Sequence, residues 1–240
     1  MITTPRTAML LAAGFGQRMR PLTETTAKPL LPVADVALID RHLDMLAAAG
    51  VKRAIVNVHW HADKVEAHLA SHKTMEIIVS DERDTLLETG GALAKARPLL
   101  GDDPVFIVNT DAFWGPADAE PLNRLAENFV PENMDELLLL ADTRRCIGYH
   151  GRGDFSKDPA GCLQRRTGEA VSDWAYAGVR ILKPELYDDQ DIAPFSANRI
   201  WNQLLENQRL YGIPLDRFWL HVGDPTALRN AEMWLRCHGE

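Results

Sequence analysis

The sequence predicts an α/β protein in which helices flank a mostly parallel β-sheet. Short apolar segments alternate with helical segments along the first half of the chain. The apolar segments carry hydrophobic side chains at nearly every position, as strands buried on both faces do. The helical segments repeat apolar residues on one helical face. Strands that alternate with helices of this length are typical of right-handed βαβ units.

The first predicted strand is "TAMLLAAG", residues 7–14, which is apolar throughout and ends in glycine. A helix follows over residues 39–50, where Gly50 provides a natural C-terminal cap. The regular pattern then continues as strand, helix, strand, helix, strand, helix and strand, over residues 53–58, 62–72, 75–80, 91–100, 104–111, 121–129 and 136–142.

The regular alternation ends after residue 143, where glycine and arginine become frequent. We expect a single domain over residues 1–240, with residues 144–175 forming a loop and hairpin insertion. The later pattern predicts a strand over 174–182, a helix over 198–212, a strand over 216–222 and a last helix with Asp224 as its N-cap.

Composition limits the partners of this chain. A net charge of −8 argues against binding to a nucleic-acid backbone but allows small anionic ligands in a local basic pocket. No segment approaches the roughly 20 apolar residues that span a bilayer, so no membrane partner is expected. Cys146, Cys162 and Cys237 lack the C-x-x-C spacing and suggest reduced thiols in a cytoplasmic protein. A monomer and a homodimer are both compatible with the sequence.

The stretch "MLLAAGFGQRMRPLTETTAKPLLPV", residues 9–33, suggests a phosphate site. A dinucleotide fingerprint G-x-G-x-x-G would need a third glycine where Met19 stands, and the Walker pattern is absent. A triphosphate site explains more of the residues. The glycine-rich turn would expose backbone N–H groups to an anion, Arg18 could clamp phosphate oxygens, and Pro29 would stiffen the segment that carries Lys28.

"LAAGFGQRMRPLT" followed by "AKPLLPV" resembles the signature of the sugar-1-phosphate nucleotidyltransferases. The resemblance implies a Rossmann-like mixed sheet, the nucleotidyltransferase fold, with a small inserted hairpin lobe. It implies a catalytic set of Arg18, Lys28 and Asp111. It also implies nucleotide binding by the first glycine-rich segment, with the base near its beginning and the triphosphate near Arg18. The residues of that segment are Leu11, Ala12, Ala13, Gly14, Gly16 and Arg18.

Later segments resemble the same family in the same order. "ETGGAL" resembles its second base-binding loop, which implies that Thr89 and Gly90 lie beside the nucleobase. "VFIVNTD" resembles the strand that ends in a metal-binding aspartate, here Asp111, with Asn109 on the substrate side. "YAGVRIL" resembles the strand with a glycine near the sugar, here Gly178. "FWLHVGDP" resembles the W-x-D-V-G-T segment that carries a second metal ligand.

Two positions depart from the family pattern. Thr110 replaces the glycine of N-G-D, and His221 replaces the second metal aspartate. Mg²⁺ prefers oxygen ligands, whereas imidazole suits softer metals. Three outcomes stay open: Asp111 holds Mg²⁺ mostly with phosphate oxygens and water, the site favours Mn²⁺, or catalysis is weak.

"HGRGDF", residues 150–155, resembles the short uridylyltransferases that act on N-acetylmuramic acid 1-phosphate in cell-wall recycling. The few residues after 224 also predict no C-terminal domain. The resemblance implies that UTP reacts with this sugar phosphate and releases pyrophosphate. Arg152 and Asp154 would then bind the sugar, or they could form a surface salt bridge. Two alternatives are a guanylyl- or thymidylyltransferase for another sugar phosphate, such as a heptose 1-phosphate, and a catalytically weak nucleotide-sugar-binding regulator.

Overall fold

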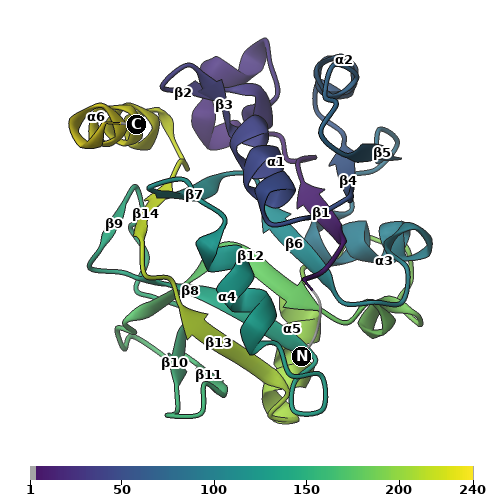
Figure 1. The fold of residues 1–240 in the computed structure, drawn as a ribbon, viewed down its shortest axis with the longest axis vertical. Helices are drawn as coiled ribbons and strands as arrows, with labels where there is room; N and C mark the ends of the chain where they lie inside the picture. Colours follow the sequence, from purple (N-terminus) through teal and green to yellow (C-terminus); the bar gives the residue numbers. More distant parts are fainter. Residues whose placement is uncertain (1–3, 240) are drawn as a thin grey trace.

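A nine-stranded mixed sheet runs through the centre of the molecule (Figure 1). The computed structural model describes residues 4–239. Four neighbouring strands are parallel and form one half of the sheet, as predicted: β5 (Glu76–Asp81), β4 (Arg53–Val58), β1 (Thr7–Leu11) and β6 (Val105–Asn109). In the other half, β12 (Trp174–Leu182) runs antiparallel to β6 and to β8 (Glu136–Asp142), and β13 (Leu210–Pro214) runs parallel to β8.

Helices cover both faces of this sheet, which explains the uniformly apolar strands. Ala8 and Leu10 of β1 pack into one hydrophobic cluster, whereas Met9 between them packs into the other. The first cluster includes residues of α1 (Leu38–Ala48), α2 (Ala62–Leu69), α4 (Glu120–Asn128) and α6 (Pro225–His238), and the second those of α3 (Glu88–Leu100) and α5 (Asn198–Glu206).

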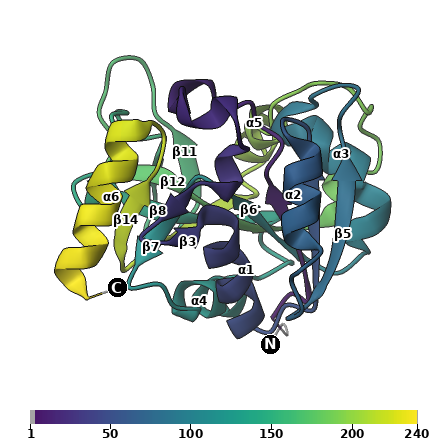
Figure 2. The same ribbon diagram turned by 90° about the horizontal axis from the view of Figure 1, so that it is seen from above.

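The carboxyl ends of β1, β4 and β6 meet at one edge of the sheet, because these strands are parallel. Residues 12–37 cover this edge as short, irregular structure, visible in purple in Figure 2. The sequence pattern does not predict these pieces, because each is too short to show a period. They are three 3₁₀ helices, η1 (Gln17–Met19), η2 (Leu22–Glu24) and η3 (Lys28–Leu30), and the hairpin of β2 (Pro32–Val33) and β3 (Val36–Ala37).

A second, three-stranded sheet lies beside the main one. Its central strand β14 (Phe218–His221) pairs with β7 (Ala112–Gly115) and β9 (Cys146–Ile147). The hairpin of β10 (Phe155–Lys157) and β11 (Leu163–Arg165) completes the nine-stranded main sheet, in which β10 pairs with the start of β12. A last 3₁₀ helix, η4 (Pro184–Tyr187), leads toward α5.

Several predicted elements have wrong boundaries. The strand predicted over 7–14 ends at Leu11, because the N–H of Ala12 bonds to the side chain of Asn57 instead of continuing the sheet, and the helix predicted over 62–72 ends at Leu69. The helix predicted over 39–50 and the strand predicted over 216–222 differ by one or two residues at each end.

The helix predicted over 198–212 ends at Glu206, because Gln208 takes a left-handed φ of 55° and Leu210 then enters the sheet as the first residue of β13. The strand predicted over 104–111 ends at Asn109, since the chain turns there into β7. The helix predicted from residue 91 begins at Glu88.

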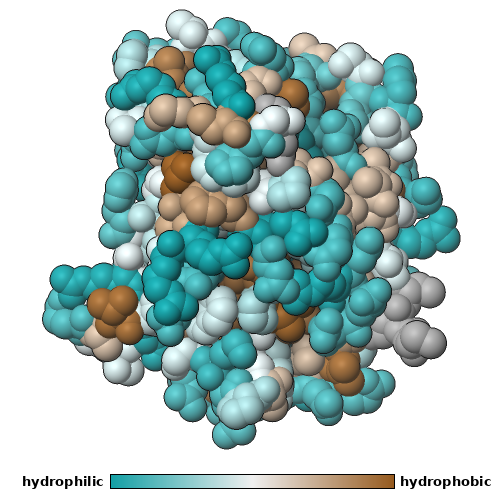
Figure 3. All heavy atoms as spheres, turned by 60° about the vertical axis from the view of Figure 1, so that its left-hand side comes forward, coloured by the Kyte–Doolittle hydropathy of each residue, from teal (hydrophilic) through white to brown (hydrophobic). Residues whose placement is uncertain are grey.

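The face shown in Figure 3 carries mainly hydrophilic side chains, with hydrophobic ones scattered among them. Within residues 4–239, no helix combines the length and the apolar character that a membrane crossing requires.

Candidate active site

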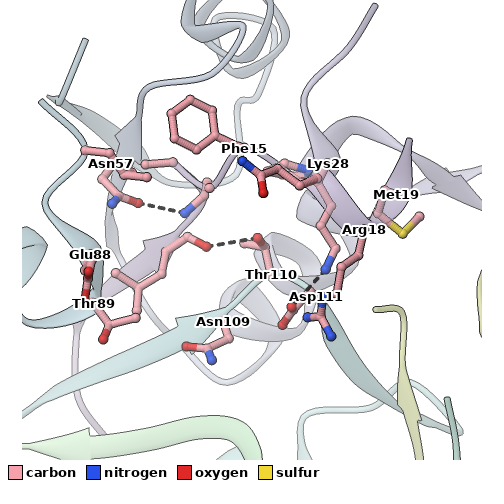
Figure 4. A pocket seen from close by; sticks show the side chains of 18 of the residues that line it. Phe15, Arg18, Met19, Lys28, Asn57, Glu88, Thr89, Asn109, Thr110 and Asp111 are labelled. Atoms are coloured by element: carbon pink, nitrogen blue, oxygen red, sulfur yellow. Dashed lines mark hydrogen bonds and ion pairs between the residues drawn. The ribbon is translucent and has the colours of Figure 1, made fainter. Parts of the chain in front are cut away.

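A cavity of about 610 Å³ opens at the carboxyl edge of β1 and β6 (Figure 4). The loop after β1 forms one wall, and the segment that leads into α3 forms another. Ligands of α/β proteins usually bind at this edge of the sheet. The lining residues are Leu11, Ala12, Ala13, Gly14, Phe15, Gly16, Gln17, Arg18, Met19, Lys28, Pro29, Asn57, Leu86, Glu88, Thr89, Asn109, Thr110, Asp111 and Gly223.

The turn after β1 requires glycine at position 16. Gly16 has a φ of 61°, a left-handed conformation, and a Cβ atom there would lie 2.8 Å from Cγ2 of Thr23. The Thr23 hydroxyl also donates a hydrogen bond of 2.8 Å to the carbonyl of Gly16. This close packing fixes the turn, so that Arg18 of the following η1 lines the cavity.

Lys28 and Arg18 point toward the carboxylate of Asp111, as Figure 4 shows. The ammonium of Lys28 lies 2.9 Å from Oδ2 of Asp111 and forms an ion pair with it. Burial by itself would raise the pKa of Asp111, but the neighbouring positive charges, of which Lys28 is the strongest, outweigh it and lower the pKa to about 2. Asp111 is therefore ionised at neutral pH, and the cavity holds cations beside a carboxylate.

His221, the last residue of β14, lies beside Asp111 but is not among the residues that line the cavity. It pairs in register with Ala112, and the N–H of Val222 donates to the carbonyl of Asp111 at 2.8 Å. Nδ1 of His221 lies 3.1 Å from the carbonyl oxygen of Gly148. Because a carbonyl only accepts, Nδ1 carries the proton in this contact, and Nε2 of the neutral ring keeps a lone pair that can ligate a metal.

The side chains at this site could hold a metal ion only if substrate oxygens or water supplied the rest of its ligands. Within the described part of the chain, no three His, Cys, Asp or Glu side chains gather as a metal site. Asp111 and His221 supply one carboxylate and one imidazole. Mg²⁺ commonly binds proteins through one or two carboxylates and takes its other ligands from substrate phosphates and water. The pair is compatible with that mode of binding.

The structure brings most of the predicted site residues together. Ten of them line the cavity: Leu11, Ala12, Ala13, Gly14, Gly16, Arg18, Lys28, Thr89, Asn109 and Asp111. Gly90 instead packs beneath Phe195, where a Cβ atom would lie 2.3 Å from the ring. Gly178, with a φ of 95°, lies beside the strand ends, and a Cβ atom there would be 3.6 Å from Cβ of Asn109.

Arg152 and Asp154 lie in the segment that leads into the β10–β11 hairpin and do not line the cavity. Arg152 forms an exposed ion pair with Glu169. The carboxylate of Asp154 accepts a hydrogen bond of 2.9 Å from the backbone N–H of Tyr176 in β12. It thereby ties the hairpin to the central sheet.

Sequence reasoning missed several residues that line the cavity, among them Phe15, Gln17, Asn57, Glu88 and Gly223. Asn57 left a signal, because it is a polar residue in the otherwise apolar end of the strand "RAIVNV". Glu88 left a weaker one, since it directly precedes Thr89. Nothing in the sequence pattern marks Phe15.

Comparisons with known proteins identify the family of this chain. Residues 7–144 match the family model described as nucleotidyl transferase. The chain is 42% identical over 236 residues to the N-acetylmuramate alpha-1-phosphate uridylyltransferase of Caulobacter vibrioides, covering 97% of this chain and 98% of that protein. It is 33% identical to the protein of the same name from Neisseria meningitidis serogroup B, covering 94% of this chain and 96% of that protein.

More distant relatives share the fold. The chain is 28% identical to the mannose-1-phosphate guanylyltransferase catalytic subunit beta of Drosophila melanogaster, covering 91% of this chain and 59% of that protein. A crystal structure described as a glucose-1-phosphate thymidylyltransferase from Bacillus anthracis superposes with a TM-score of 0.78 at 18% identity, covering 96% of this chain and 95% of that one.

The chain therefore belongs to the nucleotidyl transferase family. It is an enzyme that transfers a nucleotidyl group, and the cavity at the sheet edge is its candidate active site.

Proposed function

We propose that this enzyme joins UTP to N-acetylmuramic acid 1-phosphate and releases pyrophosphate. A phosphate oxygen of the sugar 1-phosphate attacks the α-phosphorus of UTP, and the bond from that phosphorus to the α–β bridging oxygen breaks. The observation that carries the reaction class is the convergence of Arg18, Lys28 and Asp111 beside the glycine turn. The uridylyltransferase of Caulobacter vibrioides, similar along nearly the whole chain, supports the substrates.

The residues of the cavity supply binding and charge neutralisation, which dominate catalysis of phosphoryl-type transfers. Backbone N–H groups of the turn at Gly14 and Gly16 and the guanidinium of Arg18 would hold the triphosphate. Lys28 would neutralise charge at the reacting phosphates. The nucleobase would lie against the Leu11–Gly14 segment and Thr89, and the sugar near Asn109 and Gly178.

Asp111 and His221 would hold Mg²⁺, or alternatively Mn²⁺, together with phosphate oxygens. Such an ion, when bound, neutralises phosphate charge and favours in-line geometry. With a metal bound, Asp111 would serve as its ligand, and the ammonium of Lys28 would be available for the substrate phosphates.

His221→Asp is expected to lower the Mg²⁺ concentration that gives half-maximal rate and to reduce any advantage of Mn²⁺. The change adds a hard oxygen ligand and a negative charge, where the imidazole supplies one nitrogen. Titrating both metals against pyrophosphate release measures this. His238→Asp introduces the same charge at an exposed position at the end of α6, outside the cavity lining, and serves as the control. Identical metal dependence of the wild type and His221→Asp would exclude His221 as a ligand.

One assay separates the proposed function from the alternatives. The pure protein is incubated with UTP, GTP or dTTP, with a panel of sugar 1-phosphates that includes a heptose 1-phosphate, and with Mg²⁺ or Mn²⁺. Pyrophosphate release is highest with UTP and N-acetylmuramic acid 1-phosphate if the proposal holds. A different best pair would identify a guanylyl- or thymidylyltransferase. Nucleotide-sugar binding without turnover would identify a regulator, the alternative that His221 in place of an aspartate favours.

Muramic acid carries a lactyl carboxylate, which a cationic side chain near the sugar would bind. We propose that Arg152 is this side chain. Its pair with Glu169 is weak, because the Arg152 side chain is 54% exposed and that of Glu169 is 91% exposed. A substrate carboxylate could replace Glu169 at little cost, and a guanidinium pairs well with it.

Arg165 of β11 is the competing cation. Its guanidinium donates to the side-chain oxygens of Asn198 and Asn202, and no carboxylate forms an ion pair with it among residues 4–239. Burial lowers the pKa of Arg165, and the carboxylate of Asp154 nearby only partly opposes this. The residue before Asn198, Ala197, donates its N–H to the hydroxyl of Thr89 at 2.9 Å, so Arg165 stands close to the cavity wall.

Arg152→Ala is expected to reduce kcat/KM for N-acetylmuramic acid 1-phosphate by tenfold or more, a loss of about 1.4 kcal/mol, while N-acetylglucosamine 1-phosphate changes little. Only the first sugar carries the carboxylate. Arg165→Ala is the matched variant and should change both sugars equally. If Arg165→Ala shows the selective loss instead, the role belongs to Arg165, and equal losses in both variants count against either arginine.

The proposed substrates are small molecules, so neither nucleic acid nor membrane enters the scheme. We further propose a cytoplasmic enzyme, which is supported by the three cysteines, all of them free thiols.

A further inference from the structure

Two buried polar side chains, one in the wall of the cavity and one behind it, play no part in the scheme above. Asn57 is the fifth residue of β4, and Glu82 directly follows β5. They are 3% and 1% exposed, respectively, among apolar neighbours. A carboxylate is rarely buried so completely unless hydrogen bonds compensate for the cost of removing it from water.

These side chains connect the two loops of the cavity through a continuous chain of hydrogen bonds. The N–H of Ala12 donates to Oδ1 of Asn57 at 2.7 Å, and Nδ2 of Asn57 donates to Oε1 of Glu82 at 2.8 Å. The N–H of Leu87 then donates to Oε2 of Glu82 at 3.0 Å. Ala12 lines the cavity in the first loop, and Leu87 directly precedes the lining residue Glu88 in the second.

The second loop needs such an anchor, because Glu88 has a left-handed φ of 58°. A residue other than glycine rarely takes this conformation unless its surroundings impose it. The bond from Leu87 fixes the chain one residue before the strained position. Glu82 also fixes its own turn, since its backbone carbonyl accepts from the N–H of Thr85 and its N–H donates to the carbonyl of Val58.

The charge of Glu82 suits this role. Burial raises the pKa of the Glu82 carboxyl, and the hydrogen bonds from Asn57 and Leu87 oppose that rise. An ionised carboxylate accepts two donors at once and binds each more strongly than a neutral oxygen does. A protonated carboxyl or an amide has only one oxygen without a hydrogen-bearing group. Such a side chain cannot accept from Asn57 and Leu87 at the same time.

We propose that Glu82, acting through Asn57, is a positioning residue that sets the separation of the two loops on either side of the nucleobase. The inference rests on the proposed function only in that the cavity binds a nucleoside triphosphate. Glu82 is absent from the cavity lining, so its influence on nucleotide affinity passes through Ala12 and Leu87.

The test exploits the direction of each hydrogen bond. In Glu82→Gln, the new NH₂ group must face either the NH₂ of Asn57 or the N–H of Leu87, so one bond is lost. In Asn57→Asp, two carboxylates face each other. The double variant Asn57→Asp/Glu82→Gln restores every bond. The carboxylate introduced at position 57 accepts from Ala12 and from the introduced NH₂ group, and the amide oxygen introduced at position 82 accepts from Leu87.

Glu82→Gln and Asn57→Asp should each raise KM for UTP and the Kd of UTP measured by calorimetry at least tenfold, with a smaller change in kcat. KM for the sugar phosphate should stay within about threefold of wild type. The double variant should return both UTP constants to within about threefold of the wild-type values. Glu76→Gln, at the exposed start of the same strand β5, is the matched control and should behave as wild type.

A double variant as impaired as Glu82→Gln would overturn the inference. So would a lowered melting temperature in Glu82→Gln with unchanged UTP constants, because that pattern belongs to a merely structural residue. If a single variant does not fold, Glu82→Asp, which withdraws the carboxylate by one methylene, takes its place. The calorimetric titration uses UTP, GTP and dTTP without sugar, so a wrong sugar assignment affects only the proposed function.

Discussion

Lys28→Ala is expected to abolish measurable turnover while leaving the fold intact. Lys28 is the only cation on the segment "AKPLL", and its ammonium already lies 2.9 Å from the carboxylate of Asp111 in the cavity. Removing one preorganised electrostatic group from an active site costs on the order of 10²–10³-fold in rate. The substitution also removes the positive charge that most lowers the pKa of Asp111.

Pyrophosphate release under saturating UTP and sugar phosphate measures the effect. Lys52→Ala removes an equivalent charge from an exposed position and is the control. Circular dichroism and thermal melting establish that both variants are folded. Release by Lys28→Ala within about threefold of wild type, less than roughly 1 kcal/mol of barrier, would refute a role at the reacting phosphates.

Asp111→Asn is expected to reduce the rate by a similar factor, on the order of 10²–10³. Asparagine keeps the shape of the side chain but removes the charge that would hold the metal and that now pairs with Lys28. Raising the Mg²⁺ concentration should recover only part of the rate, since the phosphates alone would then retain the ion. Metal titrations of pyrophosphate release check this, and a wild-type rate at any metal concentration would contradict it.

The same variant should alter the dependence of stability on pH. The folded-state pKa of Asp111, about 2, lies below the unfolded value of about 3.9. The ionised carboxylate therefore stabilises the fold fully above a pH of about 3.9, and this stabilisation is lost as the pH falls toward 2. Thermal melts of wild type and Asp111→Asn at pH 7 and near pH 2.5 measure this difference. The wild type should lose more stability than the variant on acidification.

The sequence predicts those strands and site residues that local patterns determine. The apolar runs of β1, β4 and β6 require a sheet covered on both faces, and parallel strands bring Asn109, Asp111 and the loop after Leu11 to one edge. Arg18 and Lys28 could be recognised because their spacing belongs to a long motif.

Local patterns do not predict contacts between segments that are distant in the sequence. Leu210 and Gly212 look like the end of a helix, but their neighbours in β8 make them a strand. Glu82 stands 25 residues from Asn57, and only the pairing of β4 with β5 places them in contact. A buried carboxylate of this kind has no local pattern that would separate it from the exposed acidic residues around it.

Residues 193–195 pack on the start of α3 and satisfy two of its backbone N–H groups. The carbonyl of Phe195 accepts from the N–H groups of Gly90 and Gly91, at 2.8 and 3.2 Å. The first turn of a helix ordinarily offers such N–H groups to an anion. Here a protein carbonyl already occupies them, and the two glycines permit that approach. The N–H groups of Gly90 and Gly91 are therefore unavailable to the proposed triphosphate, which supports the proposal that the glycine turn after β1 and its basic side chains bind the anion.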